Sequence, residues 1–257
     1  MDVAEIVARL EPWRARHRRP AWRPRVIDGE SGSAGSKFGG IPWLAAGEDW
    51  PVCGACGRPL PFFFQLDLAE VPPALAGRFG SGLLQLFYCT ECDGGWEPFA
   101  ESHMVRVVHL EGLSAPPHMA PEVQRFPAKT IVGWEELIDL PDPEEHDELG
   151  LRYTYDFQAD IVRLECPEVG LTVERDLGEE LAEAVAEAAV GDKLSGWPAW
   201  VQGVEYPSCP RCEQRMGLVF QLDSDDNLPY MWGDVGIGHL TQCPEHREVV
   251  TFAWACS

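Results

Sequence analysis

The sequence predicts an α+β fold made of two related subdomains, with mixed or antiparallel sheets and a zinc knuckle in each. Three observations favour this: an internal repeat, a helix-like segment ahead of each copy, and apolar strands after the cysteine pairs. The expected domains follow the repeat. Residues 1–135 form the first copy, 136–150 an acidic connector, and 151–257 the second copy.

The internal repeat is the strongest of these signals. Sliding the chain by 156 residues aligns 37–67 with 193–223 without a gap, and eleven of the 31 aligned positions are identical. A slide of 154 residues then aligns Cys89 with Cys243, and Cys92 with His246. Because metal-ligand residue types fall in register at four positions, we interpret the repeat as an internal duplication.

Each copy is expected to begin with a helix and continue into strands. The first helix, over 2–19, is rich in arginine and is expected to break near Pro12; the second, over 175–191, is rich in Ala, Leu and Glu. Apolar runs and alternating patterns predict strands over 61–68, 83–88, 104–110, 171–176, 217–223 and 237–242. The acidic, proline-punctuated segment Glu136–Gly150 is predicted to face solvent.

Cysteine usage points to metal or redox chemistry. The chain has nine cysteines and lacks a secretion signal or an apolar run long enough to cross a membrane, so we expect a reducing, cytoplasmic setting without disulfides. Eight metal-ligand residues form C-x-x-C or C-x-x-H pairs, two pairs in each copy. They are Cys53, Cys56, Cys89 and Cys92 in the first copy, and Cys209, Cys212, Cys243 and His246 in the second.

This pattern predicts two structural zinc ions. Zn²⁺ takes four thiolate or imidazole ligands in a tetrahedron, and a catalytic zinc usually keeps one position open for water. Both predicted sites fill all four positions, which favours a structural role. Redox-active thiol pairs and unligated buried thiols are the alternatives. His239 or Cys256 could replace His246, and Cys166 is expected to be a core residue.

The second copy also carries an acidic segment, QLDSDDNLPYMWGD. Its carboxylates, Asp223, Asp225, Asp226 and Asp234, favour a polar turn, with a cation site or an acidic contact surface as alternatives. Asp67 and Gln65 recur as Asp223 and Gln221, which indicates an architectural role in bonding to backbone. No nucleophile elbow, H-E-x-x-H or phosphate loop is present, so we do not expect an enzyme.

The charge distribution points to a cationic partner. The formal net charge is −22; residues 1–25 carry +4 and the remainder −26. Such a field repels nucleic acid and anionic membranes and attracts basic proteins, although it also serves solubility. The arginine-rich N-terminus could bind nucleic acid, but the overall charge disfavours this, and the segment could instead dock as an amphipathic helix.

The stretches SKFGGIPWL, VCGACGRPLPFFFQLDL, GDKLSGWPAW, QLDSDDNLPYMWGDVGIGHL and FAWAC resemble the YwqG-like family of bacterial proteins, from about Ser36 to the end. That family has no agreed activity, and the resemblance implies a duplicated α+β fold. The first copy also resembles, more distantly, the eukaryotic programmed cell death protein 2 group, which acts as a chaperone for a basic ribosomal protein. Some bacterial relatives are encoded near toxin clusters, which implies an immunity-type role.

Together these observations predict a non-enzymatic, zinc-stabilised protein-binding module, chaperone-like or immunity-type, that engages a basic protein. We expect a monomer. The alternative is an enzyme or small-ligand binder with an acidic cleft between the copies, formed by Asp223, Asp225, Asp234, Trp232 and Lys193.

Overall fold

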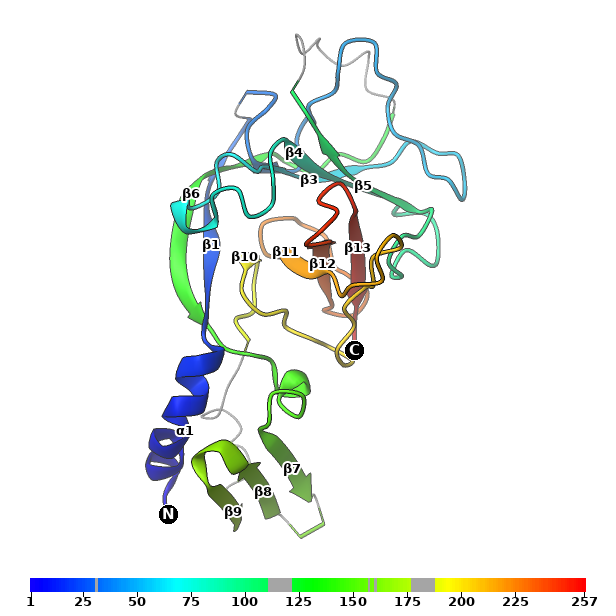
Figure 1. The fold of residues 1–257 in the computed structure, drawn as a ribbon. Helices are drawn as coiled ribbons and strands as arrows, with labels where there is room; N and C mark the ends of the chain where they lie inside the picture. The colour runs from blue at the N-terminus through cyan, green and yellow to red at the C-terminus, as the bar shows by residue number, and fades with distance from the viewer. Residues whose placement is uncertain (31, 111–121, 157, 160, 177–187) are drawn as a thin grey trace. The chain divides into compact units, whose positions relative to one another are not determined.

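The computed structural model describes residues 1–30, 32–110, 122–156, 158–159, 161–176 and 188–257. Within these ranges the chain is mostly β, with one α-helix and two sheets (Figure 1). The helix α1 spans Val3–His17, and 3-10 turns span η1 (Pro73–Leu75), η2 (Pro143–Glu145) and η3 (Pro167–Val169). The strands are β1 (Arg19–Asp28), β2 (Lys37–Phe38), β3 (Phe62–Asp67), β4 (Leu83–Tyr88), β5 (His103–Val108), β6 (Lys129–Asp139), β7 (Arg152–Asp156), β8 (Ile161–Cys166), β9 (Leu171–Arg175), β10 (Lys193–Ser195), β11 (Gly217–Asp223), β12 (Ile237–Gln242) and β13 (Val250–Ala255).

The chain folds into two compact units, each assembled from separate stretches. Unit 1 comprises Met1–Ala21, Leu137–Val190 and Gly196–Glu205; unit 2 comprises Trp22–Glu136, Gly191–Ser195 and Tyr206–Ser257. The predicted boundaries, at residues 135 and 151, separate the two copies of the repeat. The compact units are divided at other positions, because each unit contains segments from both copies. The difference arises because β10 of the later copy lies beside β1 of the earlier one in a single sheet.

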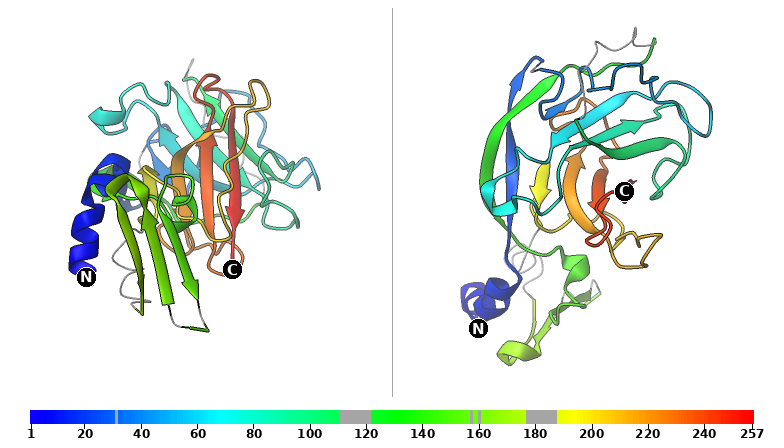
Figure 2. Two further views of the ribbon diagram at one scale, coloured as in Figure 1. Left: turned by 60° about the horizontal axis from the view of Figure 1, so that its bottom comes forward. Right: turned by 45° about the horizontal axis from the view of Figure 1, so that its top comes forward.

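Unit 2 is built on a ten-stranded sheet in the order β13-β12-β11-β10-β1-β6-β2-β3-β4-β5. Figure 2 gives two further views of these strands, coloured along the chain. The strands β2 to β5 form one end and β10 to β13 the other, with β1 and β6 between them. Within each end, successive strands pair antiparallel. Strands that follow one another along the chain can pair in this way without a crossover connection.

The two ends of this sheet pair in the same register. Lys37 lies opposite Gln65, and Lys193 lies opposite Gln221. Each end also has an irregularity at an equivalent point, between Phe62 and Phe64 in β3 and between Leu218 and Phe220 in β11. A one-residue slip would turn every side chain to the other face of the sheet, so equal registers place equivalent side chains in equivalent environments.

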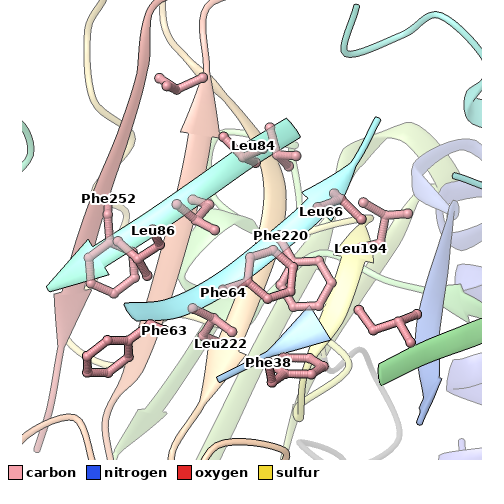
Figure 3. Close-up of a cluster of buried hydrophobic side chains, with 14 of the residues drawn as sticks. Phe38, Phe63, Phe64, Leu66, Leu84, Leu86, Leu194, Phe220, Leu222 and Phe252 are labelled. Atoms are coloured by element: carbon pink, nitrogen blue, oxygen red, sulfur yellow. The ribbon is translucent and has the colours of Figure 1, made fainter. Parts of the chain in front are cut away.

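The core of unit 2 lies between the two ends of the sheet. Phe64 of β3 and Phe220 of β11 are fully buried with ring centroids 4.4 Å apart, and Phe38 packs on the same ring of Phe220 (Figure 3). Since β3 and β11 are not neighbours in the sheet, their contact requires the sheet to curve back over itself. Aromatic side chains each bury roughly 150–250 Å², so these rings contribute strongly to the core.

Unit 1 packs α1 against the three-stranded sheet β7-β8-β9. The helix buries Ile6, Leu10 and Trp13 in a cluster with side chains from all three strands. The predicted break near Pro12 is wrong, because α1 continues through it to His17. Trp13 offsets the proline by burying its ring and donating its Nε1–H to the Leu149 carbonyl at 2.9 Å.

The predicted solvent-facing connector over Glu136–Gly150 is also corrected. Its first residues end β6, and Asp139, Asp142 and Glu145 are buried. Their carboxylates accept hydrogen bonds within unit 1: Asp139 binds the backbone N–H groups of Ala189 and Trp197 at 2.7 and 2.8 Å. Backbone donors compensate the cost of removing these charges from water, so the acidity serves architecture rather than solvation.

The strand predictions from apolar runs are confirmed at β3, β4, β5, β9, β11 and β12. The fold class is more strongly β than the predicted α+β, and the strand pairs within each end of the large sheet and within the small sheet are antiparallel. The helix predicted over 175–191 falls largely on residues 177–187, which lie outside the described residues.

Candidate metal centres

The first cysteine pair lies in a tight knuckle that closes before β3. The Gly57 N–H donates to the Cys53 carbonyl, and the Cys53 N–H donates to the Arg58 carbonyl, both at 2.8 Å. Gly57 has a φ of 70°, a conformation in which a glycine avoids the Cβ clash of other residues. The turn therefore directs both sulfurs, of Cys53 and Cys56, to one side.

The second cysteine pair completes the first centre. Cys89 directly follows β4, the antiparallel partner of β3, and its N–H is held by the Ser102 carbonyl at 2.8 Å. The four sulfurs all lie within 4.8 Å of one another. Cys53 Sγ is 3.7 Å from Cys92 Sγ, and Cys56 Sγ is 3.8 Å from Cys89 Sγ.

The second centre repeats this construction 156 residues later. The Glu213 N–H donates to the Cys209 carbonyl at 2.8 Å, and the Cys209 N–H donates to the Gln214 carbonyl at 2.9 Å. Glu213 adopts a φ of 61° where the first knuckle has glycine. Cys212 Sγ lies 3.6 Å from Cys243 Sγ.

The fourth member of the second centre is His246. Its Nδ1 lies 3.8 Å from Cys209 Sγ and 3.8 Å from Cys243 Sγ. The ligand group contains the predicted His246 and neither His239 nor Cys256, the alternatives for its position. His239 sits in β12 opposite Gln221 and Ala253. Cys166 is fully buried in the core of unit 1, as expected.

Both groups have the dimensions of a metal-binding tetrahedron. A Zn–S distance of about 2.3 Å sets the edge between two sulfurs at about 3.8 Å. The observed separations of 3.6 to 3.8 Å match that edge. They are far longer than a disulfide bond of about 2.0 Å, and none of the nine cysteines is in a disulfide. Either group could therefore hold a metal ion.

Backbone N–H groups around the sulfurs favour the thiolate form. The Arg211 N–H points to Cys209 Sγ at 3.4 Å, and the His246 N–H points to Cys243 Sγ at 3.3 Å. In the first centre, the Arg58 backbone N–H and the neighbouring Cys92 lower the pKa of the Cys56 thiol to about 7. A thiolate is the form that binds metal, so these donors support the assignment of the ligands.

The acidic segment of the second copy is largely a hydrogen-bonded turn. Asp223 Oδ2 accepts the Gly191 N–H at 2.7 Å, and Asp226 Oδ2 accepts the Asp192 N–H at 2.7 Å. Asp192 itself, which sequence reasoning missed, accepts the Asp223 N–H at 2.8 Å and is buried. Burial and the nearby Asp226 raise the pKa of Asp192 to about 7. The signal that could have found it is its alignment with Ser36, whose Oγ accepts an equivalent N–H.

The repeated glutamines are buried hydrogen-bonding centres, as predicted. Gln65 donates its side-chain amide to the Ser33 and Gly35 carbonyls, and Gln221 donates to the Gly191 carbonyl at 2.9 Å.

Two of the residues considered for an acidic cleft, Lys193 and Trp232, are buried in unit 2. No helix in the described part of the chain is long and apolar enough to cross a membrane.

These features define an antiparallel β-rich protein with two four-ligand candidate metal centres built on similar knuckles. The chain belongs to a family described as a domain of unknown function, DUF1963, whose profile matches residues 36–246. Over 34 residues, 13% of this chain, it is 50% identical to the uncharacterized protein YpfL of Salmonella typhimurium (strain LT2). That match spans 8% of the YpfL length.

Proposed function

We propose that both centres hold Zn²⁺ as structural ions. The ligand sets, four cysteines in one and three cysteines with a histidine in the other, are those typical of structural zinc. Each ion is surrounded by protein ligands at all four corners, so it ties a knuckle to the strands behind it. The sulfur separations are the observation that supports this most directly.

The twin knuckles also support a duplication of the chain as the origin of the fold. Equivalent hydrogen bonds close both turns, and equivalent irregularities interrupt β3 and β11. The resemblance to the YwqG-like family agrees with this proposal. On this view, the two copies differ at one ligand position, Cys92 in the first and His246 in the second, which gives the two centres different charges.

For the whole protein we infer a non-enzymatic binding module that captures a basic protein, as a chaperone-like or immunity-type binder. The observation that carries this is the charge of −26 beyond residue 25. A surface of that charge speeds the encounter with a cationic partner, and the attraction weakens as salt screens it. The ions would stabilise the scaffold and take no part in chemistry.

Two measurements test these proposals separately. Elemental analysis of the purified protein is expected to give two zinc ions per chain. Affinity purification from the native cells, followed by binding of each recovered protein in purified form at 50 and 500 mM salt, is expected to yield a basic partner with salt-sensitive affinity. Recovery of acidic or neutral partners, or affinity independent of salt, contradicts the binding proposal while leaving the zinc proposal intact.

A further inference from the structure

The chain between Cys92 and β5 presents two aromatic side chains to solvent. Trp96 and Phe99 are 49% and 45% exposed, although unit 2 buries most of its other large rings. Exposed aromatic residues of this size are enriched where proteins bind one another. We call the segment Glu91–Glu101 the acidic aromatic loop.

The acidic aromatic loop is anchored at three points along its length. The Trp254 N–H donates to the Trp96 carbonyl at 3.1 Å, and the Phe99 N–H donates to Thr251 Oγ1 at 2.7 Å. At its end, the Gly54 N–H donates to the Glu101 carbonyl at 2.8 Å. The rings therefore extend from a backbone that is already ordered, which lowers the entropy lost when a partner binds.

Negative charge surrounds the two rings. The residues Glu91, Asp93, Glu97 and Glu101 are all exposed, and the sequence from 89 to 105 contains no lysine or arginine. Arg58 pairs with Glu91 at 2.9 Å. The other three carboxylates are exposed, and none of them forms an ion pair with another described residue. An apolar centre with a charged rim is the arrangement found in specific protein interfaces.

A hollow of about 430 Å³ adjoins the loop. Its lining combines apolar side chains, among them Val52, Phe99 and Val250, with the polar side chains of Glu101, His103 and Thr251. Val52 is 53% exposed and precedes the ligand Cys53. The first metal centre therefore supports both the hollow and the loop, since Cys53 and Cys92 lie at their bases.

We propose that the acidic aromatic loop and the adjoining hollow bind an extended segment of a basic protein, in which arginine or lysine alternates with apolar side chains. This inference rests on the proposed function and assigns it a surface. The cationic side chains would pair with Glu97 and Glu101, and an apolar side chain would enter the hollow beside Phe99. Charge complementarity selects this occupant over an acidic or purely apolar one.

The test uses the full zinc-loaded chain and a fluorescein-labelled 12-residue peptide of alternating arginine and leucine, followed by fluorescence anisotropy. The double variant Glu97→Lys/Glu101→Lys is expected to weaken binding at least tenfold. The matched control, Glu135→Lys/Glu136→Lys, makes the same change in net charge at exposed positions of β6 and is expected to stay within about twofold. Phe99→Ala is expected to weaken binding at least fivefold, and Val132→Ala, also at an exposed apolar residue, to leave it unchanged.

The outcomes separate this surface from the general proposal. Equal weakening by both double variants overturns the loop as the site while leaving capture of basic proteins standing. An intact basic partner that binds while the peptide does not also overturns it. Equal affinity for a peptide with serine in place of leucine overturns the role of the hollow. Zinc content and circular dichroism of every variant verify that the fold is retained.

Discussion

Phe64 and Phe220, which are 156 residues apart and occupy equivalent positions of the repeat, stack in the core of unit 2 with their ring centroids 4.4 Å apart. Each ring is fully buried, and each belongs to the strand that follows a cysteine knuckle. The two ends of the sheet thus meet through the same residue of each copy. Their contact couples the two knuckle-bearing ends into one core.

This relationship predicts strong and coupled destabilisation. Phe64→Ala and Phe220→Ala are each expected to lower the free energy of unfolding by about 3–5 kcal/mol, because each leaves a cavity in a packed core. The double variant should cost less than the sum by about 0.5–1.5 kcal/mol, the energy of an aromatic pair beyond its area. Denaturant unfolding of the four proteins measures both quantities, and strict additivity would contradict the contact.

The second centre makes a prediction about His246. Removing it by His246→Ala is expected to reduce bound zinc from two ions per chain to one, whereas His246→Cys should retain two because thiolate is an equivalent ligand. Cys256→Ser and His239→Gln serve as controls at the other ligand types nearby and should keep both ions. Elemental analysis after dialysis against a weak chelator gives the count; loss of zinc in Cys256→Ser would reassign the ligand.

The two knuckles differ in the residue that adopts the left-handed turn, which predicts effects of different size on stability. Gly57→Ala places a Cβ at a φ of 70° and is expected to cost about 1–2 kcal/mol. No atom beyond the neighbouring residues in the chain lies within 4 Å of that Cβ position, so the cost is conformational and not a clash with a packed neighbour. Glu213→Gly removes the same conformational cost at a φ of 61°. Glycine also raises the conformational entropy of the unfolded chain, which stabilises the unfolded state by about 0.4–1 kcal/mol. Because the two effects offset each other, the stability of this variant should be close to that of the parent. Melting temperatures of the zinc-loaded proteins compare them; a larger loss at Glu213 would refute the account.

Asp192 predicts a pH dependence of stability. Burial and Asp226 raise its folded-state pKa to about 7, so the folded chain holds a proton that the unfolded chain releases near pH 4. The stability that this extra proton contributes is fully present below pH 4 and is lost as the pH rises to about 7. Over that range the free energy of unfolding falls by at most about 1.4 kcal/mol per pH unit. Asp192→Ser copies Ser36, keeps an acceptor and should remove this slope.

The measurement for Asp192 is the difference in unfolding free energy between parent and variant from pH 4.5 to 8. Asp225→Asn is the control, because Asp225 is exposed and its φ of 54° suits asparagine. It should leave the slope of the parent unchanged. A difference between parent and Asp192→Ser that does not vary with pH would show that Asp192 is ionised throughout this range.

Local features of the sequence predicted the strands beside the knuckles and the composition of both ligand groups. Apolar runs such as Phe62–Asp67 can only be buried, and a C-x-x-C turn brings its own two sulfurs together. The strand β1 was missed because its prolines and arginines carry no periodic signal, and its pairing partners lie far along the chain. Whether such a segment forms a strand depends on pairing with distant parts of the chain.

Buried acidic residues were the main failure of sequence reasoning. The composition of Glu136–Gly150 indicates a solvated connector, since carboxylates are usually exposed. Asp139 and Asp142 are buried because backbone N–H groups from residues about 50 positions away bind them. No local pattern records a donor at that distance, so only the folded chain identifies these carboxylates.

This burial predicts that Asp139 is essential to unit 1. Asp139→Ala leaves the N–H groups of Ala189 and Trp197 without their carboxylate acceptor, and each lost charged hydrogen bond costs about 1.5–3 kcal/mol. Asp147→Ala, in the same segment but exposed, is expected to change stability by less than about 0.5 kcal/mol. Hydrogen exchange of the Trp197 amide gives a local readout, and it should accelerate in Asp139→Ala alone. Equal protection in both variants would mean that another acceptor holds this amide.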